Sequence, residues 1–301
     1  MIMENKKENH HHEVTGKNLG WTILLNVVIT VGEVIGGIIS GSMALLGDAA
    51  HNFSDVLSLI ISYIANKLTK RKATRNKTYG YKRSEIFAAF INAAVLIVLA
   101  VIILIEGLQR LYETPDIDAN WVIILAIGSI ILNGLSVLFI RNDARDSMNI
   151  KSALLHLFGD MLTSVAVLLG GLAMKYLNWY WTDGVFSILI AGYLLYTSWG
   201  ILKSSLRIIM QFTPENLDVE KIVKAVEKLP QIKNLHHVHV WQINEHDIMF
   251  EAHADMNQNI AISEFETILE QIKTLLQDFE ITHYTIQPEY ETADNKELIH
   301  K

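Results

Sequence analysis

The chain has 301 residues, a net charge of −7 at pH 7 and no cysteine. The negative charge argues against a general nucleic-acid-binding protein. Without cysteine, disulfides and thiolate ligands are excluded, so a metal ion can be held only by histidine, carboxylate or backbone oxygen. Apolar runs crowd residues 19–207, whereas residues 212–301 have the composition of a soluble domain.

Six apolar segments are long enough to cross a bilayer as helices, which takes about 20 residues each. The polar residues 1–18 lead directly into the first segment, so we expect no signal peptide. Basic residues gather in the connections after the second and fourth segments. The positive-inside rule therefore predicts that both termini lie in the cytoplasm. The expected location is the cell (inner) membrane, as a multi-pass protein. The predicted spans cover residues 19–40, 45–66, 85–108, 119–140, 153–176 and 181–202.

The second and fifth segments contain the same motif, His-x-Phe-x-Asp-x-Leu, at residues 51–57 and 156–162. Helical residues four positions apart project from one face, so each segment presents a histidine and an aspartate together. Two imidazoles and two carboxylates that meet at one point form a tetrahedral site suited to Zn²⁺. The predicted ligands of this site are His51, Asp55, His156 and Asp160.

A structural role is the alternative for each motif, because a lone histidine on an apolar helix is usually a packing residue. Ionisable groups are costly inside a bilayer, and the repetition of the motif in two segments therefore favours a functional site. Asp48 and Asn52 lie on the same segment as His51. For this reason Asp48 is a further candidate for the ion pathway.

The C-terminal region is predicted to form a small α+β domain of order α-β-β-α-β. Apolar periodicity predicts helices and alternation predicts strands, over residues 217–229, 236–243, 247–256, 262–279 and 282–289. The expected domains are a histidine-containing cytoplasmic tail (1–18), a six-helix transmembrane domain (19–211), this cytoplasmic domain (212–290) and a C-terminal tail (291–301).

Histidines cluster in the cytoplasmic domain, at positions 236, 237, 239, 246, 253 and 283. Alternate strand positions share a face, so His237 and His239 are expected to point together and His236 away from them. Any one of these is more often a surface residue, but the set, together with Glu289, indicates a second metal site. The run His10-His11-His12-Glu13 has a metal-binding composition or is a tag remnant, and the sequence leaves its role open.

Five motifs make the chain resemble the cation diffusion facilitator family, in particular the bacterial cobalt–zinc–cadmium resistance type of zinc exporter. They are SGSMALLGDAAHNFSDV (40–56), TYGYKRSEIFAA (78–89), SALLHLFGDMLTSV (152–165), HHVHVW (236–241) and HYTIQPE (283–289). The resemblance covers residues 19–290. It implies six transmembrane helices, a ferredoxin-like cytoplasmic domain, a homodimer and zinc export in exchange for protons.

The resemblance also assigns ligands. It places the transport site on His51, Asp55, His156 and Asp160, and cytoplasmic zinc ligands on His236, His253, His283 and Glu289. Zn²⁺ is then the transported substrate and a candidate regulatory ligand, with no organic cofactor. The implied partners are a second copy of the chain, membrane lipid, divalent metal ions and protons, with no nucleic acid.

The expected function is proton-coupled efflux of Zn²⁺, and also of Cd²⁺ and Co²⁺, by alternating access. Imidazole ligands favour these ions over Mg²⁺ and Ca²⁺. Two other functions stay open: a membrane metal-dependent hydrolase and a metal sensor that does not transport. The hydrolase is disfavoured because the chain lacks both HExxH and GxSxG. The sequence does not decide which of the three metals is the physiological one.

Overall fold

The computed structural model of the protein describes residues 17–299 apart from 70, 114, 141–147 and 294. The described chain divides into two compact units. One contains the residues up to Ile60 together with Ala94–Ser198, and the other contains Ile61–Ala93 together with the residues from Trp199 onward.

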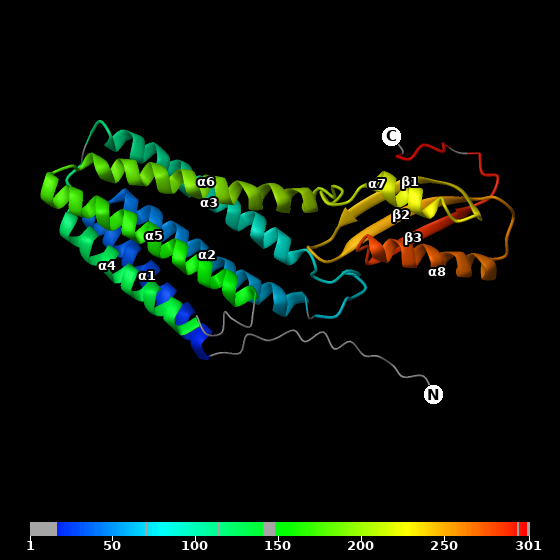
Figure 1. Cartoon of the computed structure of the whole chain (residues 1–301), viewed down its shortest axis with the longest axis horizontal. Helices are drawn as coiled ribbons and strands as arrows, with labels where there is room; N and C mark the ends of the chain where they lie inside the picture. The colour runs from blue at the N-terminus through cyan, green and yellow to red at the C-terminus, as the bar shows by residue number, and fades with distance from the viewer. Residues whose placement is uncertain (1–16, 70, 114, 141–147, 294, 300–301) are drawn as a thin grey trace. The chain divides into compact units, whose positions relative to one another are not determined.

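Six long helices begin and end close to the predicted apolar segments, which confirms that these segments are helical (Figure 1). By length and apolar composition, four described helical segments can cross a membrane, and Leu24–Ser40 is a shorter apolar helix. The four are Ser84–Arg110, Ala119–Leu138, Leu157–Leu177 and Trp181–Ile209. The full helices are α1 (Lys17–Ser40), α2 (Met43–Thr69), α3 (Ser84–Arg110), α4 (Ala119–Ile140), α5 (Met148–Leu177) and α6 (Trp181–Ile209).

Glycines let these helices approach closely. A Cβ atom at Gly36 of α1 would lie 1.7 Å from a methyl carbon of Leu125 on α4. A Cβ atom at Gly184 of α6 would lie 2.7 Å from the carbonyl oxygen of Gly107 on α3. Small residues at such crossings are typical of helix packing in membranes, where close contact replaces the hydrophobic effect.

A buried ion pair joins three helices of the first unit. The Asp183 carboxylate at the start of α6 is fully buried and lies 2.8 Å from Arg110 Nη1 at the end of α3. The same carboxylate accepts hydrogen bonds from the Ser42 hydroxyl and from the backbone N–H groups of Met43 and Ala44. It thereby satisfies backbone donors of the first turn of α2 that have no partner within the helix. The orientation of α2, which carries His51 and Asp55, is fixed at this end.

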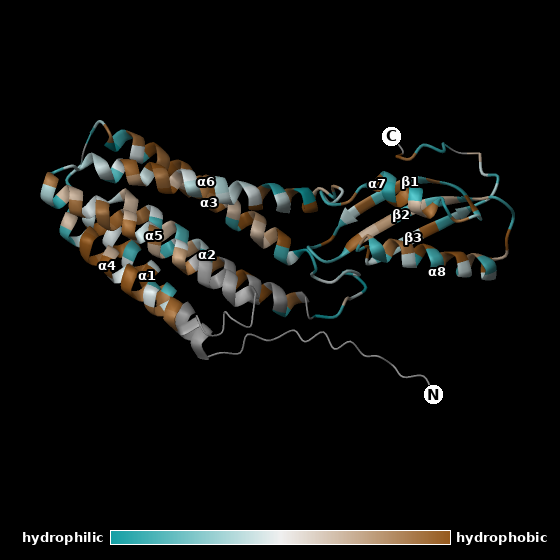
Figure 2. Ribbon diagram, in the orientation of Figure 1, coloured by the Kyte–Doolittle hydropathy of each residue, from teal (hydrophilic) through white to brown (hydrophobic). Residues whose placement is uncertain are grey.

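The second unit contains the predicted α-β-β-α-β domain, with the order α7-β1-β2-α8-β3. The sheet order is β1-β2-β3, with β1 and β2 antiparallel and β2 and β3 parallel. Figure 2 shows alternating polar and apolar colours on these elements and long apolar stretches on α3 and α4. The elements are α7 (Val219–Val226), β1 (Ile232–Gln242), β2 (Ile248–Met256), α8 (Ile262–Asp278) and β3 (His283–Glu289).

The core of this domain lies between the sheet and its two helices. Phe250 of β2 packs with Ile222 of α7 and with Ile268 and Ile272 of α8, and all four side chains are buried. Asp218 caps α7 by accepting a hydrogen bond from the backbone N–H of Lys221, which lowers the pKa of the Asp218 carboxyl. The fold class expected from the sequence, a helical membrane domain followed by a small α+β domain, is confirmed.

Candidate functional site

Three of the four predicted transport ligands lie together in the first unit. His51 Nε2 on α2 is 3.2 Å from Asp160 Oδ1 on α5 and 3.9 Å from Asp55 Oδ2, one turn along α2. One donor atom from each residue lies within 4.8 Å of the other two. His156 is on α5, one turn before Asp160, but its side chain lies outside the described part of the structure. The described donors, one imidazole and two carboxylates, suit Zn²⁺.

A second polar layer joins α2 and α5 next to this cluster. Thr163 and Ser164 donate hydrogen bonds of 2.7 and 3.1 Å to the two carboxylate oxygens of Asp48. Both hydroxyls also lie within hydrogen-bond distance of the Asp160 carbonyl oxygen. Asp48 thus contacts the helical turn that follows Asp160, three residues before His51 in its own helix. This layer sets the register of the two ligand-bearing helices.

Further contacts position α2 from its other sides. Asn52 Nδ2 donates a 2.7 Å hydrogen bond to Glu33 Oε2 on α1, and both side chains are buried. On α6, the ring of Tyr193 meets the His51 ring edge-on at a centroid distance of 5.6 Å. The role of Asp48 in the ion pathway, which the sequence predicts, stays a prediction. The structure adds Glu33 and Tyr193 to the residues that surround the cluster on α2.

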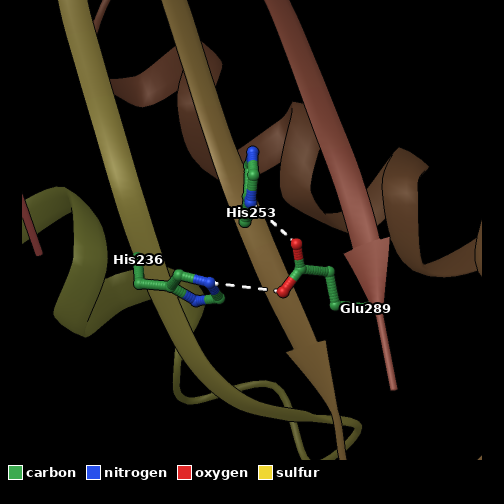
Figure 3. A group of neighbouring side chains, drawn as sticks. All are labelled: His236, His253 and Glu289. Carbon is green, nitrogen blue, oxygen red and sulfur yellow. Dashed lines mark ion pairs between the residues drawn. The ribbon is translucent and has the colours of Figure 1, made fainter. Parts of the chain in front are cut away.

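In the second unit, three of the four predicted cytoplasmic ligands converge from three strands (Figure 3). Glu289 of β3 lies between the two histidines. Its Oε2 is 3.3 Å from His236 Nε2 on β1, and its Oε1 is 2.8 Å from His253 Nδ1 on β2. His236 and His253 are brought together because they are directly opposite in the antiparallel register.

The donor atoms of this cluster fit a metal ion. Asn234 Oδ1 lies 3.0 Å from His236 Nδ1. An N–H on Nδ1 that donates to this oxygen leaves the Nε2 lone pair facing the cluster, which is how carbonyl oxygens orient metal-binding histidines. His253 Nδ1 is buried and makes no hydrogen bond with the residues that the structure describes, although Glu289 Oε1 is only 2.8 Å away. Two donor atoms that face one position in this way suit a shared cation.

The histidine rings of β1 differ from the expected alternation. His237 and His239 do lie together, with ring centroids 5.0 Å apart. His236, however, does not point away to a separate environment, because both His236 and His237 contact His253, at 5.5 and 4.6 Å. The reason is local: the strand register shifts between His236 and His239, and His237 has a φ of +53°. Such a bulge breaks the two-residue period of side-chain direction.

The fourth predicted cytoplasmic ligand is not brought to the cluster. His283 is exposed at the start of β3, opposite Met249. It precedes Glu289 by six residues, which is about 20 Å along a strand. The run His10-His11-His12-Glu13 lies outside the described residues.

Two charged residues at the cytoplasmic cluster were not singled out from the sequence. Asp255 lies opposite Glu289 on the neighbouring strand, and Lys296 reaches the cluster from the segment after β3. Asp255 had a signal, since strand positions two apart share a face and His253 is such a neighbour. Lys296 had none, because a long-range contact of an irregular segment leaves no period in the sequence.

Both the helical region and the C-terminal domain of the chain match known protein families. Residues 21–210 match the model of the cation efflux transmembrane domain, and residues 214–291 match the model of the cytoplasmic domain of cation efflux proteins.

Individual relatives align over nearly the whole chain. A cadmium, cobalt and zinc/H(+)-K(+) antiporter of Bacillus subtilis is 35% identical, with 97% of this chain and 94% of the relative covered. The zinc transporter ZitB of Pectobacterium atrosepticum is 34% identical, with 95% and 90% covered. The metal cation efflux system protein CzcD of Cupriavidus metallidurans is 33% identical, with 92% and 89% covered.

Proposed function

We propose a specific transport function for this chain, which belongs to the cation efflux family, also called the cation diffusion facilitators. The protein exports Zn²⁺ from the cytoplasm in exchange for protons. Membership of the family makes the protein a membrane-embedded transporter of metal cations and not an enzyme. The proposal adds the coupling to protons, the mechanism of alternating access and the identity of the ligands. Cd²⁺ and Co²⁺ are proposed as further substrates.

The cluster of His51, Asp55 and Asp160 carries this proposal. Its donors come from two different helices of the membrane domain, so a movement of α2 against α5 changes the site and its access together. Zinc binding requires ionised carboxylates and neutral imidazoles and therefore releases protons. Protons that return from the far side displace the ion, and imidazole exchanges protons near neutral pH. We assign His156 as the fourth ligand, one turn before Asp160.

The remaining parts of the proposal concern the surroundings of the site. We infer a homodimer in the inner membrane with both termini in the cytoplasm, and the match of residues 214–291 to the cytoplasmic-domain model supports the dimer. The cluster of His236, His253 and Glu289 is proposed to bind Zn²⁺ as a regulatory ligand. The proposed domain limits are those expected from the sequence, 1–18, 19–211, 212–290 and 291–301.

Flux into proteoliposomes tests the proposal. Purified protein is reconstituted with a pH gradient, and zinc uptake is followed together with internal pH. The expected result is zinc movement with opposite proton movement, lost in Asp160→Asn and retained in Asp116→Asn, a matched change of an exposed aspartate. Zinc flux without proton movement would overturn the coupling. Absence of any zinc flux would favour the alternative function, a metal sensor that does not transport. Full transport activity of Asp160→Asn would show that Asp160 is not a ligand of the transport site.

A further inference from the structure

A lysine from the segment after β3 lies at the cytoplasmic cluster. Lys296 Nζ is 2.9 Å from Asp255 Oδ1, 2.9 Å from Glu289 Oε2 and 3.4 Å from His236 Nε2. An ammonium group has three N–H donors and no acceptor. Two carboxylate oxygens and the Nε2 lone pair of His236 are the acceptors that match them. The contacted atoms of Glu289 and His236 are also the donor atoms proposed to hold zinc.

The main chain around Lys296 is fastened to strand β1. The backbone N–H of His237 donates to the Glu297 carbonyl oxygen (3.2 Å), and that of Val238 donates to the Leu298 carbonyl oxygen (2.8 Å). The Leu298 side chain packs against the hydrophobic core of the domain. The ammonium is therefore held at the cluster by a segment that two backbone hydrogen bonds attach to β1 and that the Leu298 side chain attaches to the core.

We propose that Lys296 is a built-in competitor for the cytoplasmic metal site, whose ammonium must leave before zinc can bind. The Lys296 ammonium, with its charge of +1, already pairs with the carboxylates of Glu289 and Asp255. A zinc ion needs the same Glu289 carboxylate and can bind it only after the ammonium has left. Zn²⁺ and the ammonium cannot share one position, since like charges repel strongly in a partly buried site. This inference rests on the proposed zinc binding by the cluster.

Two consequences follow from displacement of the lysine. The Asp255 carboxylate loses its cationic partner and becomes available as a fourth ligand, in the place that His283 does not fill. The segment 295–299 loses its charged anchor, so zinc binding weakens the attachment of this segment to β1. The lysine thus raises the zinc concentration at which the site fills and couples filling to release of the segment.

Zinc titration of the full-length protein tests the competition. The protein is purified in detergent with Asp55→Asn and Asp160→Asn, which removes the membrane site, and binding is measured by calorimetry. Addition of Lys296→Gln is expected to tighten binding about tenfold, the effect of losing a hydrogen-bonded charge partner. The matched control Lys273→Gln removes an equal charge from α8, where its partner is Glu270, and is expected to change nothing. Equal affinity in the two lysine variants would overturn the proposal.

Amide hydrogen exchange of β1 tests the release. In protein with Lys296 intact, zinc is expected to accelerate exchange at the amides of His237 and Val238, which bond to the segment. Leu298→Ala keeps the ammonium but weakens its tether, so this variant is expected to bind zinc more tightly than the intact chain. If zinc does not change the protection of these two amides against hydrogen exchange, the inference is overturned. Retention of zinc binding in His253→Ala with Glu289→Gln would instead refute the proposed site itself.

Discussion

Thr163 of α5 donates a hydrogen bond of 2.7 Å to the carboxylate of Asp48 on α2. The aspartate precedes His51 by three residues, and the threonine follows Asp160 by three residues. The bond therefore lies one helical turn from the His51–Asp160 contact on both helices. The distance between the two ligand-bearing helices is therefore held in part by Asp48 and Thr163, which are not themselves proposed ligands.

Replacement of Thr163 by valine should weaken zinc transport without abolishing it. The change keeps the shape of the side chain but removes the link to Asp48, so the ligands of α5 are held less firmly. Loss of a supporting hydrogen bond of this kind costs about tenfold in metal affinity, and we expect the zinc concentration for half-maximal flux to rise by that factor. Thr197→Val is the control, since its hydroxyl bonds only to backbone oxygens of its own helix among the contacts described. The same flux curve for both variants would argue against the role of Asp48.

His51→Asp should shift metal selectivity toward harder cations. The variant replaces an imidazole nitrogen by carboxylate oxygen, and oxygen ligands suit Mn²⁺ better than nitrogen ligands do. Competition of Mn²⁺, Cd²⁺ and Co²⁺ with zinc uptake in proteoliposomes measures the change. An unaltered ranking of the four metals would mean that His51 does not set selectivity.

Removal of the buried carboxylate at the start of α6 should strongly destabilise the helical unit. Asp183→Ala leaves Arg110 without its ion-pair partner and the start of α2 without its acceptor. Breaking one side of a buried pair costs about 3–5 kcal/mol. We expect a clear fall in the unfolding temperature of detergent-purified protein. Exchange of the pair for Arg110→Met with Asp183→Leu should recover part of the loss, because no unpaired charge then stays buried.

Zinc should stabilise the cytoplasmic domain through its three-strand cluster. A ligand that binds only the folded state raises the unfolding temperature by mass action. In protein that carries Asp160→Asn, we expect a zinc-dependent rise in the unfolding transition of the cytoplasmic domain. His253→Ala with Glu289→Gln should remove most of this rise, whereas His283→Ala, on the same strand but away from the cluster, should leave it intact. A loss in the His283 variant equal to that in the double variant would restore His283 to the ligand set.

The sequence determined the features that depend on local pattern. Apolar length and period set the six helices and the order α7-β1-β2-α8-β3, because both patterns are repeated every few residues. The spacing in the two His-x-Phe-x-Asp-x-Leu motifs placed His51 beside Asp55 for the same reason. The pairing of these motifs across two helices needed the additional inference that buried charge in a membrane has a function.

Only the tertiary structure decided which distant residues meet. His236 meets His253 because the two residues are paired across the antiparallel strands, and the register shift that follows His236 also brings His237 against His253. Such a bulge has no reliable sequence period. The direction of β3 carries Glu289 to the cluster and leaves His283 at the other end of the strand. Lys296 is held at the same cluster because backbone hydrogen bonds attach its segment to β1 and Leu298 packs against the core. These choices depend on packing energies between segments far apart in the chain, which local pattern does not encode.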